Sequence, residues 1–188
     1  MDAIILAAGL SERMGRNKLL LPFGESTILN CVIEKAKPFA DRIIVVTGHE
    51  SNLIEASIKD DGIIFAFNEN YKKGQKGSVL RGIKESIDDF FIIPGDVPMI
   101  ACEDICNTIA LLKNASAARC FFKDIPAHPV AFKKENREKI LSYPGPIKNY
   151  LDEIGFSRHQ GTIGSAFDAD TSIRYESLLT GNPDSSLL

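Results

Sequence analysis

A loop of small and basic residues is the first part of this chain in which chemistry is expected. The run Leu6-Ala-Ala-Gly-Leu-Ser-Glu-Arg-Met-Gly-Arg-Asn-Lys18 follows an apolar N-terminal stretch and ends in a cation. Small residues let backbone N–H groups approach an anion closely, and Arg13, Arg16 and Lys18 add positive charge. The chain lacks the G-x-x-x-x-G-K-[ST] spacing of a P-loop and a dinucleotide fingerprint. The loop is therefore predicted to hold phosphate in another way.

Two acidic positions follow apolar stretches farther along the chain. Asp96 comes directly after Phe-Phe-Ile-Ile-Pro-Gly, so its carboxylate is expected at the end of a buried strand. Asp168 and Asp170 lie in Phe-Asp-Ala-Asp-Thr. Such carboxylates suit Mg²⁺ or Mn²⁺, because a hard cation of this kind takes one or two protein carboxylates and fills its other positions with water and phosphate oxygens. Capping a helix or forming a turn is the structural alternative for each aspartate.

A Gly-rich stretch and one histidine complete the candidate set. The stretch Asn68–Ser78 predicts a loop that leads into a helix, and Ser78 has the right type to cap that helix. His128 precedes Pro129, which restricts the histidine to an extended conformation before an apolar strand. A lone histidine in such a position often has only a structural role.

The elements that must position these residues alternate along the chain. Apolar, β-branched runs predict strands over residues 3–6, 43–47, 63–67, 90–94, 117–122 and 130–132. Helical patterns separate most of them, over residues 27–39, 53–59, 78–87, 103–112 and 134–141. This alternation implies parallel βαβ units, and strands that are apolar on both faces require helices on both sides. The chain is therefore predicted to be an α/β protein with a three-layer, Rossmann-like fold and a mostly parallel central sheet.

The candidate residues follow successive predicted strands. The loop at 7–18 follows the first strand, Gly48 the second, Asn68 the third and Asp96 the fourth. Because ligands of such sheets bind beyond the carboxyl ends of the strands, these residues are expected to form one site.

Length and composition indicate one domain. A chain of 188 residues can bury a sizeable core as a single unit, predicted over residues 1–179 with a mobile tail over 180–188. No apolar run approaches the length that a bilayer requires, and Asp2 stands where a signal peptide would carry basic residues. These features predict a cytoplasmic protein without a membrane partner. A formal net charge of −3 argues against generic nucleic-acid binding.

The cysteines and the two other histidines give weaker signals. The four cysteines show no C-x-x-C pair and are predicted to be buried free thiols; they stand at positions 31, 102, 106 and 120. Cys102 and Cys106 are one helical turn apart but make a poor zinc site without a nearby His or further Cys. His49 and His159 are expected in loop or surface positions.

Several motifs, taken in order, resemble one enzyme family. The run LAAGLSERMGRNKLLLPFGESTIL is similar to the signature of the nucleotidyltransferases that activate molybdopterin, most closely the molybdenum cofactor cytidylyltransferases. Further matching motifs are VVTGHE at 45–50, NENYKKGQKGSV at 68–79, GDVPMI at 95–100, IPAHPVAF at 125–132 and FDADT at 167–171. Together they span residues 2 to 171, which is nearly the whole chain.

The resemblance implies an activity and a set of residue roles. The reaction would transfer CMP from CTP to the phosphate of molybdopterin or the molybdenum cofactor, release pyrophosphate, and supply a molybdenum hydroxylase apoenzyme. Arg13, Lys18 and Asp96 would be catalytic, with Asp96 and Asp170, or alternatively Asp168, as metal ligands. His128 would lie near the pterin-bearing substrate. The implied nucleotide-binding residues are Ala7, Ala8, Gly9, Ser11, Arg13, Lys18, Gly48, Asn68, Gly77 and Ser78.

Three alternatives to this activity remain open. A molybdopterin guanylyltransferase typically reads L-A-G-G in the first motif, so Ala8 points toward cytosine by resemblance. Another nucleotidyltransferase with a small phosphate acceptor is a more distant enzyme alternative. A non-catalytic cofactor carrier or chaperone is the alternative of another class, because the last motif holds only through Thr171.

Overall fold

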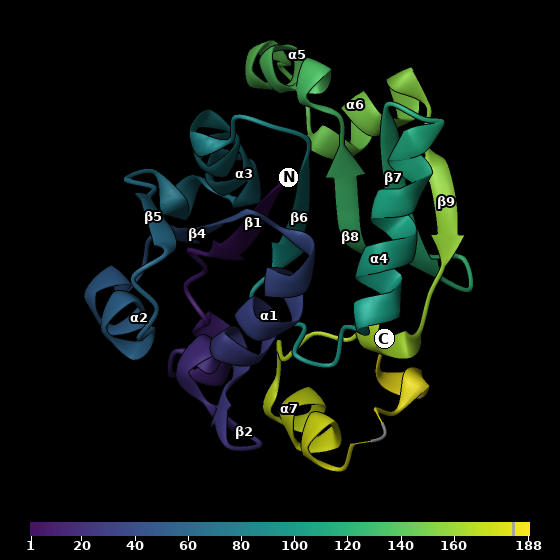
Figure 1. Ribbon diagram of the computed structural model, residues 1–188. Helices are drawn as coiled ribbons and strands as arrows, with labels where there is room; N and C mark the ends of the chain where they lie inside the picture. The colour runs from purple at the N-terminus through teal and green to yellow at the C-terminus, as the bar shows by residue number, and fades with distance from the viewer. Residues whose placement is uncertain (182) are drawn as a thin grey trace.

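A central sheet between two layers of helices organises the molecule (Figure 1). The computed structural model describes residues 1–181 and 183–188. The strands of the main sheet are β1 (Asp2–Ala7), β4 (Arg42–Thr47), β5 (Ile63–Phe67), β6 (Phe90–Pro94), β7 (Ala117–Phe122), β8 (Ile125–Phe132) and β9 (Ser157–Gln160). A separate short hairpin consists of β2 (Pro22–Phe23) and β3 (Ser26–Thr27).

The main sheet is mostly parallel. Its order over the described residues is β5-β4-β1-β6-β8-β7-β9. The first four of these strands run parallel, and Ile5 of β1 lies in register with Val45 of β4 and Ile93 of β6. β8 is antiparallel to both β6 and β7, and β9 is parallel to β7. The prediction of a three-layer α/β fold with a mostly parallel sheet is therefore confirmed.

The helices cover both faces of the sheet. They are α1 (Ile28–Ala36), α2 (Ser51–Ser57), α3 (Gln75–Glu85), α4 (Cys102–Ala110), α5 (Arg137–Ser142), α6 (Ile147–Ile154) and α7 (Ser172–Leu179). Side chains of α1, α2, α4 and α7 join one buried cluster, and those of α3, α5 and α6 join a second. The two clusters lie on opposite faces because successive residues of a strand point to opposite sides.

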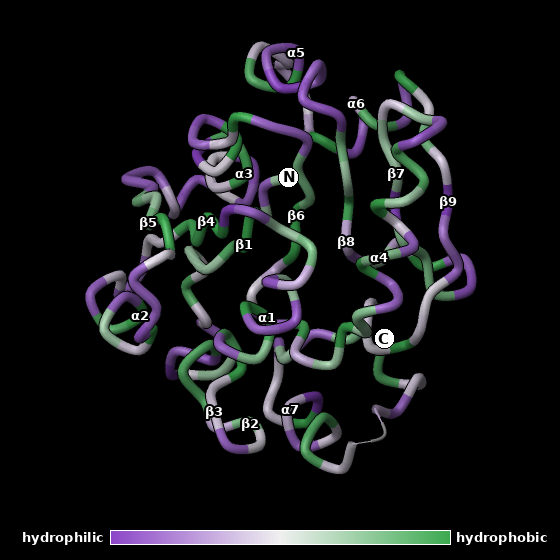
Figure 2. Tube along the Cα trace, viewed as in Figure 1, coloured by the Kyte–Doolittle hydropathy of each residue, from purple (hydrophilic) through white to green (hydrophobic). Residues whose placement is uncertain are grey.

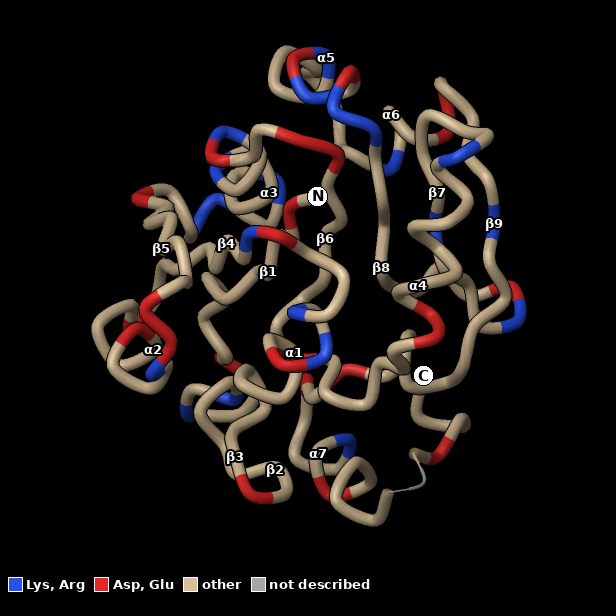
Figure 3. Tube along the Cα trace, in the orientation of Figure 1, with Lys and Arg blue, Asp and Glu red and all other residues tan. Residues whose placement is uncertain are grey.

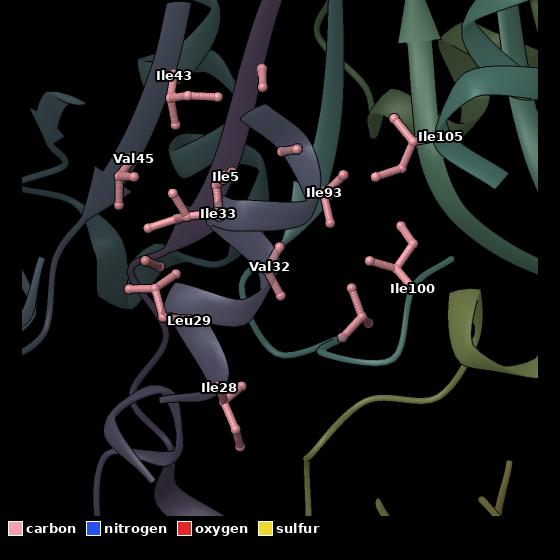
Figure 4. Packing of buried hydrophobic residues seen from close by; sticks show 14 of the residues in the cluster. Ile5, Ile28, Leu29, Val32, Ile33, Ile43, Val45, Ile93, Ile100 and Ile105 are labelled. Atoms are coloured by element: carbon pink, nitrogen blue, oxygen red, sulfur yellow. The ribbon is translucent and has the colours of Figure 1, made fainter. Parts of the chain in front are cut away.

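The central strands are apolar on both faces. Ala3 and Ile5 of β1 belong to the cluster under α1, whereas Ile4 belongs to the cluster under α3. Figure 2 shows β1, β4 and β6 as mostly hydrophobic segments. Figure 4 shows how Val32 and Ile33 of α1 lie over the sheet. These strands therefore form a buried, well-packed centre, and the candidate site lies at their carboxyl ends.

One glycine lets α3 approach the sheet closely. A Cβ atom at Gly82 would lie 2.4 Å from Ile4 Cγ2 and 2.9 Å from Val46 Cγ2. We expect Gly82→Ala to lower the free energy of unfolding by about 1–3 kcal/mol, because the core has no space for the methyl group. At Gly77 in the same helix, the nearest atom to such a Cβ is 3.4 Å away. Gly77→Ala should therefore stabilise the helix, by about 0.5–1 kcal/mol. Urea denaturation of both variants tests this, and equal effects would contradict it.

Several predicted boundaries differ from the structure. β8 begins at Ile125, earlier than the predicted 130, and the helix 147–154 and strand 157–160 were not predicted. α3 begins at Gln75 with Gly74 in the capping position, so the prediction that Ser78 caps this helix is wrong. Gly74 adopts a φ of 104°, which is unfavourable for residues that have a side chain. Because glycine tolerates this conformation, the helix can start before Ser78.

The end of the chain packs beside α7. Arg174 Nε donates a hydrogen bond to the Leu187 carbonyl oxygen at 2.8 Å, and residue 182 of the predicted mobile tail lies outside the described residues. The division at residue 179 and the mobility of the tail stay predictions.

Helices long and apolar enough to cross a membrane are absent from the described part of the chain. Figure 3 shows acidic and basic segments interspersed over the molecule.

The cysteines differ from their prediction in burial. All four are free, as predicted, but Cys102 and Cys106 are exposed and Cys31 is only partly buried. α4 buries Asp104, Ile105 and Thr108, and Cys102 and Cys106 lie outside this buried face. Cys120 is fully buried, and this burial raises the pKa of its thiol to about 11. Without a bound metal ion, this thiol is therefore protonated at neutral pH.

Candidate active site

The ends of β1 and β6 bring Asp96 together with the loop of residues 7–18, which is called the phosphate loop after its predicted role. The backbone N–H of Gly95 donates to the Leu6 carbonyl oxygen at 2.8 Å, which extends the pairing of the two strands to the first residues of the loop. The loop turns at Ser11, whose φ of 52° is in the left-handed region. Ser11 Oγ accepts a hydrogen bond from the Lys18 backbone N–H at 3.3 Å. The loop therefore folds back so that Lys18 faces the end of β6.

Lys18 is the centre of the polar site. Its Nζ donates hydrogen bonds to the carboxylates of both Asp96 and Asp170. Arg13 adds a contact from NH1 to Asp170 Oδ2 at 3.1 Å. The Ala169 N–H donates to the Asp96 carbonyl oxygen at 2.9 Å, which holds the segment before α7 against the end of β6. Residues far apart in the chain thus form one cluster of two carboxylates and two cations.

The structure distinguishes the two aspartates of the last motif. Asp168 Oδ1 accepts hydrogen bonds from Arg174 NH1 at 2.7 Å and from the Asp170 N–H at 3.1 Å. Only Asp170 shares Lys18 with Asp96. Thr171 caps α7, because its side chain accepts from the Arg174 N–H, so the alternative that an aspartate caps this helix is wrong. Asp170 is therefore the better placed candidate ligand.

The electrostatics of the cluster follow from burial and pairing. Burial raises the pKa of Asp96, although the Lys18 charge opposes this effect. Burial also disfavours the charged form of Asp170, but Lys18 and Arg13 outweigh it and lower the pKa of that carboxyl. For Lys18, burial is likewise outweighed by the two carboxylates, so its pKa is raised. Lys18 and Asp170 are therefore charged at neutral pH.

One oxygen of Asp96 is a candidate ligand for a cation. Asp96 Oδ1 is buried and has no hydrogen-bond partner among the described residues, although Oδ2 contacts Lys18. A buried carboxylate oxygen without a partner is costly unless a cation or water satisfies it. With Asp170 beside it, the donor set consists of hard carboxylate oxygens. The residues therefore fit a divalent metal ion.

A pocket of about 310 Å³ opens beside Lys18. It is lined by Leu6, Ala8, Gly9, Leu10, Ser11, Lys18, Leu19, Tyr71, Lys72, Gly74, Gln75, Ser78, Pro94 and Asp96. A second pocket of about 270 Å³ shares Gly9, Ser11 and Lys18 with it and adds Arg13 and Asp170. The two pockets meet at the phosphate loop, so one elongated ligand can reach both.

Some predicted residues support the first pocket without lining it. Asn68 is buried, and its amide donates to Ser78 Oγ at 3.0 Å while its side-chain oxygen accepts from the Asn70 N–H at 3.0 Å. A Cβ at Gly48 would lie 2.6 Å from Tyr71 Cβ and 2.9 Å from Ala8 Cβ, so only glycine permits this approach. Ala7 is fully buried, and Gly77 lines a separate surface depression with Asn68.

His128 lines a third, smaller pocket. The residue lies within β8, not before a strand as predicted, because the strand continues past Pro129. The pocket measures about 150 Å³ and also contains Arg119 and Lys148, and it shares Leu6 and Gln75 with the first pocket. Burial, with Arg119 nearby, lowers the pKa of His128 to about 3. Its Nδ1 is buried without a partner among the described residues, so a neutral histidine is available for a ligand.

The other two histidines lie outside the pockets, and several pocket-lining residues were not predicted from the sequence. His49 lies in a loop, as predicted. His159 lies on the edge strand β9 rather than in a loop, and its partly exposed side chain contacts Asp104. Sequence reasoning missed Tyr71, Gln75, Arg119 and Lys148 as lining residues. For Tyr71 and Gln75 the signal was present, because both belong to the Gly-rich stretch after the third strand.

Comparisons with known proteins agree with this geometry. Residues 3–153 match the MobA-like NTP transferase domain. The chain therefore belongs to the MobA-like NTP transferase family. The nucleotidyltransferase resemblance predicted from the motifs is confirmed. A molybdenum cofactor cytidylyltransferase of Escherichia coli (strain K12) is 37% identical over 146 residues, which cover 77% of this chain and 76% of that protein.

Solved structures show the same fold as this MobA-like chain. A crystal structure of Rv0371c from Mycobacterium tuberculosis H37Rv superposes with a TM-score of 0.84 at 22% identity, covering 95% of this chain and 96% of that chain. A second crystal structure, of the Rv0371C complex with manganese, has a TM-score of 0.78 at 19% identity and covers 95% and 97% of the two chains.

Proposed function

We propose that this nucleotidyltransferase transfers CMP from CTP to the phosphate of molybdopterin or the molybdenum cofactor and releases pyrophosphate. The observation that carries the proposal is the junction of the first two pockets, where Lys18 contacts both Asp96 and Asp170 beside the small-residue loop. The cytidylyltransferase of Escherichia coli, 37% identical, supports this choice of nucleotide and acceptor.

The phosphate loop would bind the triphosphate. Lys18 and Arg13 lie where they can neutralise charge on the α-phosphate and on the departing pyrophosphate. Asp96 and Asp170 would hold Mg²⁺, or Mn²⁺ as in the structural relative with manganese. When bound, such an ion would add to the neutralisation of charge on the phosphate oxygens. Because the acceptor phosphate is itself the nucleophile, positioning and charge neutralisation suffice without a covalent intermediate.

The first pocket would bind the nucleoside. Ala8 and Leu10 supply one wall from the phosphate loop, and Tyr71, Gln75 and Ser78 supply polar groups on the other. Ser78 is fixed by its hydrogen bond from Asn68, so its hydroxyl has a defined place. This combination of a tight apolar wall and fixed polar groups favours a small, specific base.

The third pocket would bind the pterin end of the acceptor. Its apolar walls suit a flat ring, and Arg119, His128 and Lys148 offer polar contacts. It adjoins the first pocket through Leu6 and Gln75, so the acceptor phosphate can reach the α-phosphate. The product would be a cytosine dinucleotide form of the cofactor, which we expect a molybdenum hydroxylase apoenzyme to receive in the cytoplasm.

Pyrophosphate release tests the proposed function directly. With molybdopterin and Mg²⁺, kcat/KM should be much higher for CTP than for GTP, because a purine is too large and leaves buried polar groups unpaired. A preference for GTP would support the guanylyltransferase alternative, and no release with any nucleoside triphosphate would support a carrier.

Ala8 gives a sharper version of the same test. The Ala8 methyl group narrows the pocket, so Ala8→Gly is expected to reduce the preference for CTP over GTP. The variant should not use GTP efficiently, because the polar groups on the other wall are unchanged. Gly24→Ala is the control. Gly24 lies in the hairpin loop outside the pocket, where the methyl group has open space but the φ of 59° is unfavourable for alanine. A change in this variant would therefore measure the indirect effect of altering a loop residue. An unchanged CTP to GTP ratio in Ala8→Gly would exclude Ala8 from base selection.

A further inference from the structure

Three side chains from separate elements meet at the far edge of the sheet. Asp104 of α4, Cys120 of β7 and His159 of β9 each offer one ligand atom, and these atoms all lie within 4.8 Å of one another. Cys120 and His159 are direct partners in the parallel register of β7 and β9. Asp104 comes from the helix packed against both strands. The cluster is separate from the residues described above as lining the three pockets.

The Asp104 carboxylate is held in one orientation. Its Oδ2 accepts hydrogen bonds from the Thr162 N–H at 3.0 Å, from Thr162 Oγ1 at 2.7 Å and from Ser165 Oγ at 2.5 Å. Its Oδ1 instead lies 3.2 Å from His159 Nε2. Outer hydrogen bonds that saturate one oxygen and direct the other are typical of carboxylates that bind metals.

The donor set selects the class of ion. One thiolate sulfur, one imidazole nitrogen and one carboxylate oxygen suit Zn²⁺, whereas Mg²⁺ and Ca²⁺ prefer oxygen alone. Tetrahedral Zn²⁺ with bonds of about 2.0–2.3 Å holds its ligand atoms about 3.5 Å apart. The three ligand atoms lie within 4.8 Å of one another, so they would have to move closer together to reach this separation. We expect a water molecule as the fourth ligand, approaching past His159, whose side chain, 18% exposed, is the most exposed of the three.

We propose that Asp104, Cys120 and His159 form a zinc site that ties β9 to α4 and β7. β9 has four residues and pairs only with β7 among the described residues, so the sheet hydrogen bonds that hold this edge are few. An ion bound to residues 104, 120 and 159 would link three distant parts of the chain. The role is structural, and it is independent of the proposed transferase activity.

Zinc binding by the full chain tests the proposal. The protein is stripped with a chelator, and its affinity for Zn²⁺ is measured by competition with a chromogenic chelator. One Zn²⁺ per chain is expected for the wild type. Cys120→Ser and His159→Gln should each weaken binding more than about 100-fold, beyond the 10–100-fold loss typical of outer-shell changes. Ser165→Ala, which removes one bond to Asp104, should fall within that lower range.

Two further measurements separate a metal site from a hydrogen-bonded cluster. Co²⁺ added in place of Zn²⁺ should give a sulfur-to-cobalt charge-transfer band that Cys120→Ser lacks. Zn²⁺ should raise the unfolding temperature of the wild type and of Cys102→Ser, whose exposed thiol lies outside the cluster, but not that of His159→Gln. His159→Gln changes a partly exposed residue, so it serves even if Cys120→Ser does not fold. Absence of zinc binding in the wild type, or equal affinity in His159→Gln, would overturn the proposal.

Discussion

Asp96→Asn is expected to lower kcat/KM for CTP by at least about 100-fold, which corresponds to about 2.7 kcal/mol of transition-state stabilisation. The change keeps the shape of the side chain and removes the charge that we assign to metal binding. The reason for this assignment is Asp96 Oδ1, which is buried and has no hydrogen-bond partner in the described part of the chain. Steady-state kinetics at saturating Mg²⁺ measure the loss.

The fold of that variant should remain intact. Burial raises the pKa of Asp96, so its ionised form reduces stability at neutral pH, and Asn removes this cost. Lys18 still contacts Asp170. The unfolding temperature at neutral pH should therefore be equal to or above that of the wild type. Asp61→Asn, an exposed carboxylate in the turn before β5, is the matched control and should leave activity unchanged. Full turnover by Asp96→Asn would remove this residue from the mechanism.

Lys18→Met is expected to cost about 2–4 kcal/mol in kcat/KM for CTP, the range typical of a lost preorganised electrostatic donor. Its ammonium group is largely buried, and it contacts both candidate metal ligands at the junction of the two pockets. Arg13→Met should have a smaller effect than Lys18→Met. The Arg13 side chain is 74% exposed and contacts Asp170 alone of these carboxylates, so water screens more of its charge.

The control for this pair lies in the same loop. Arg16 is exposed, and Arg16→Met changes the net charge by the same amount as the other two substitutions. Pyrophosphate release by all three variants at one ionic strength measures the order, which should be Lys18, then Arg13, then Arg16. Near-native kcat/KM in both Lys18→Met and Arg13→Met would refute the assignment of this loop to the triphosphate.

The strands and the phosphate loop were predictable because their signals are local. β5, β6 and β7 have the bounds that the sequence predicts, since β5 and β6 are continuous apolar runs and β7 is apolar except for Arg119. The loop after β1 was recognised from its small residues and its cations, which lie within a few positions of one another. The motifs also determined the family, because their order along the chain is specific.

The strand β9 and the start of α3 were not predicted, because the residues near them in the sequence do not distinguish these elements from loops. β9 has four residues with three polar side chains and an arginine, a pattern that is typical of surface loops as well. It is a strand only because β7 offers it a partner. The start of α3 depends on the backbone of Gly74, so Ser78 enters the helix and becomes a pocket residue.

Tertiary structure alone decided how the polar residues combine. Lys18 contacts Asp96 and Asp170, which lie 78 and 152 positions later in the chain. The sequence left Asp168 and Asp170 as alternatives, and the hydrogen bond from Arg174 to Asp168 separates them. The cluster of Asp104 and His159 also joins residues from distant elements. Sequence patterns show which residue types follow each strand, but the distances between side chains depend on strand order and register, and these arise only when the sheet assembles.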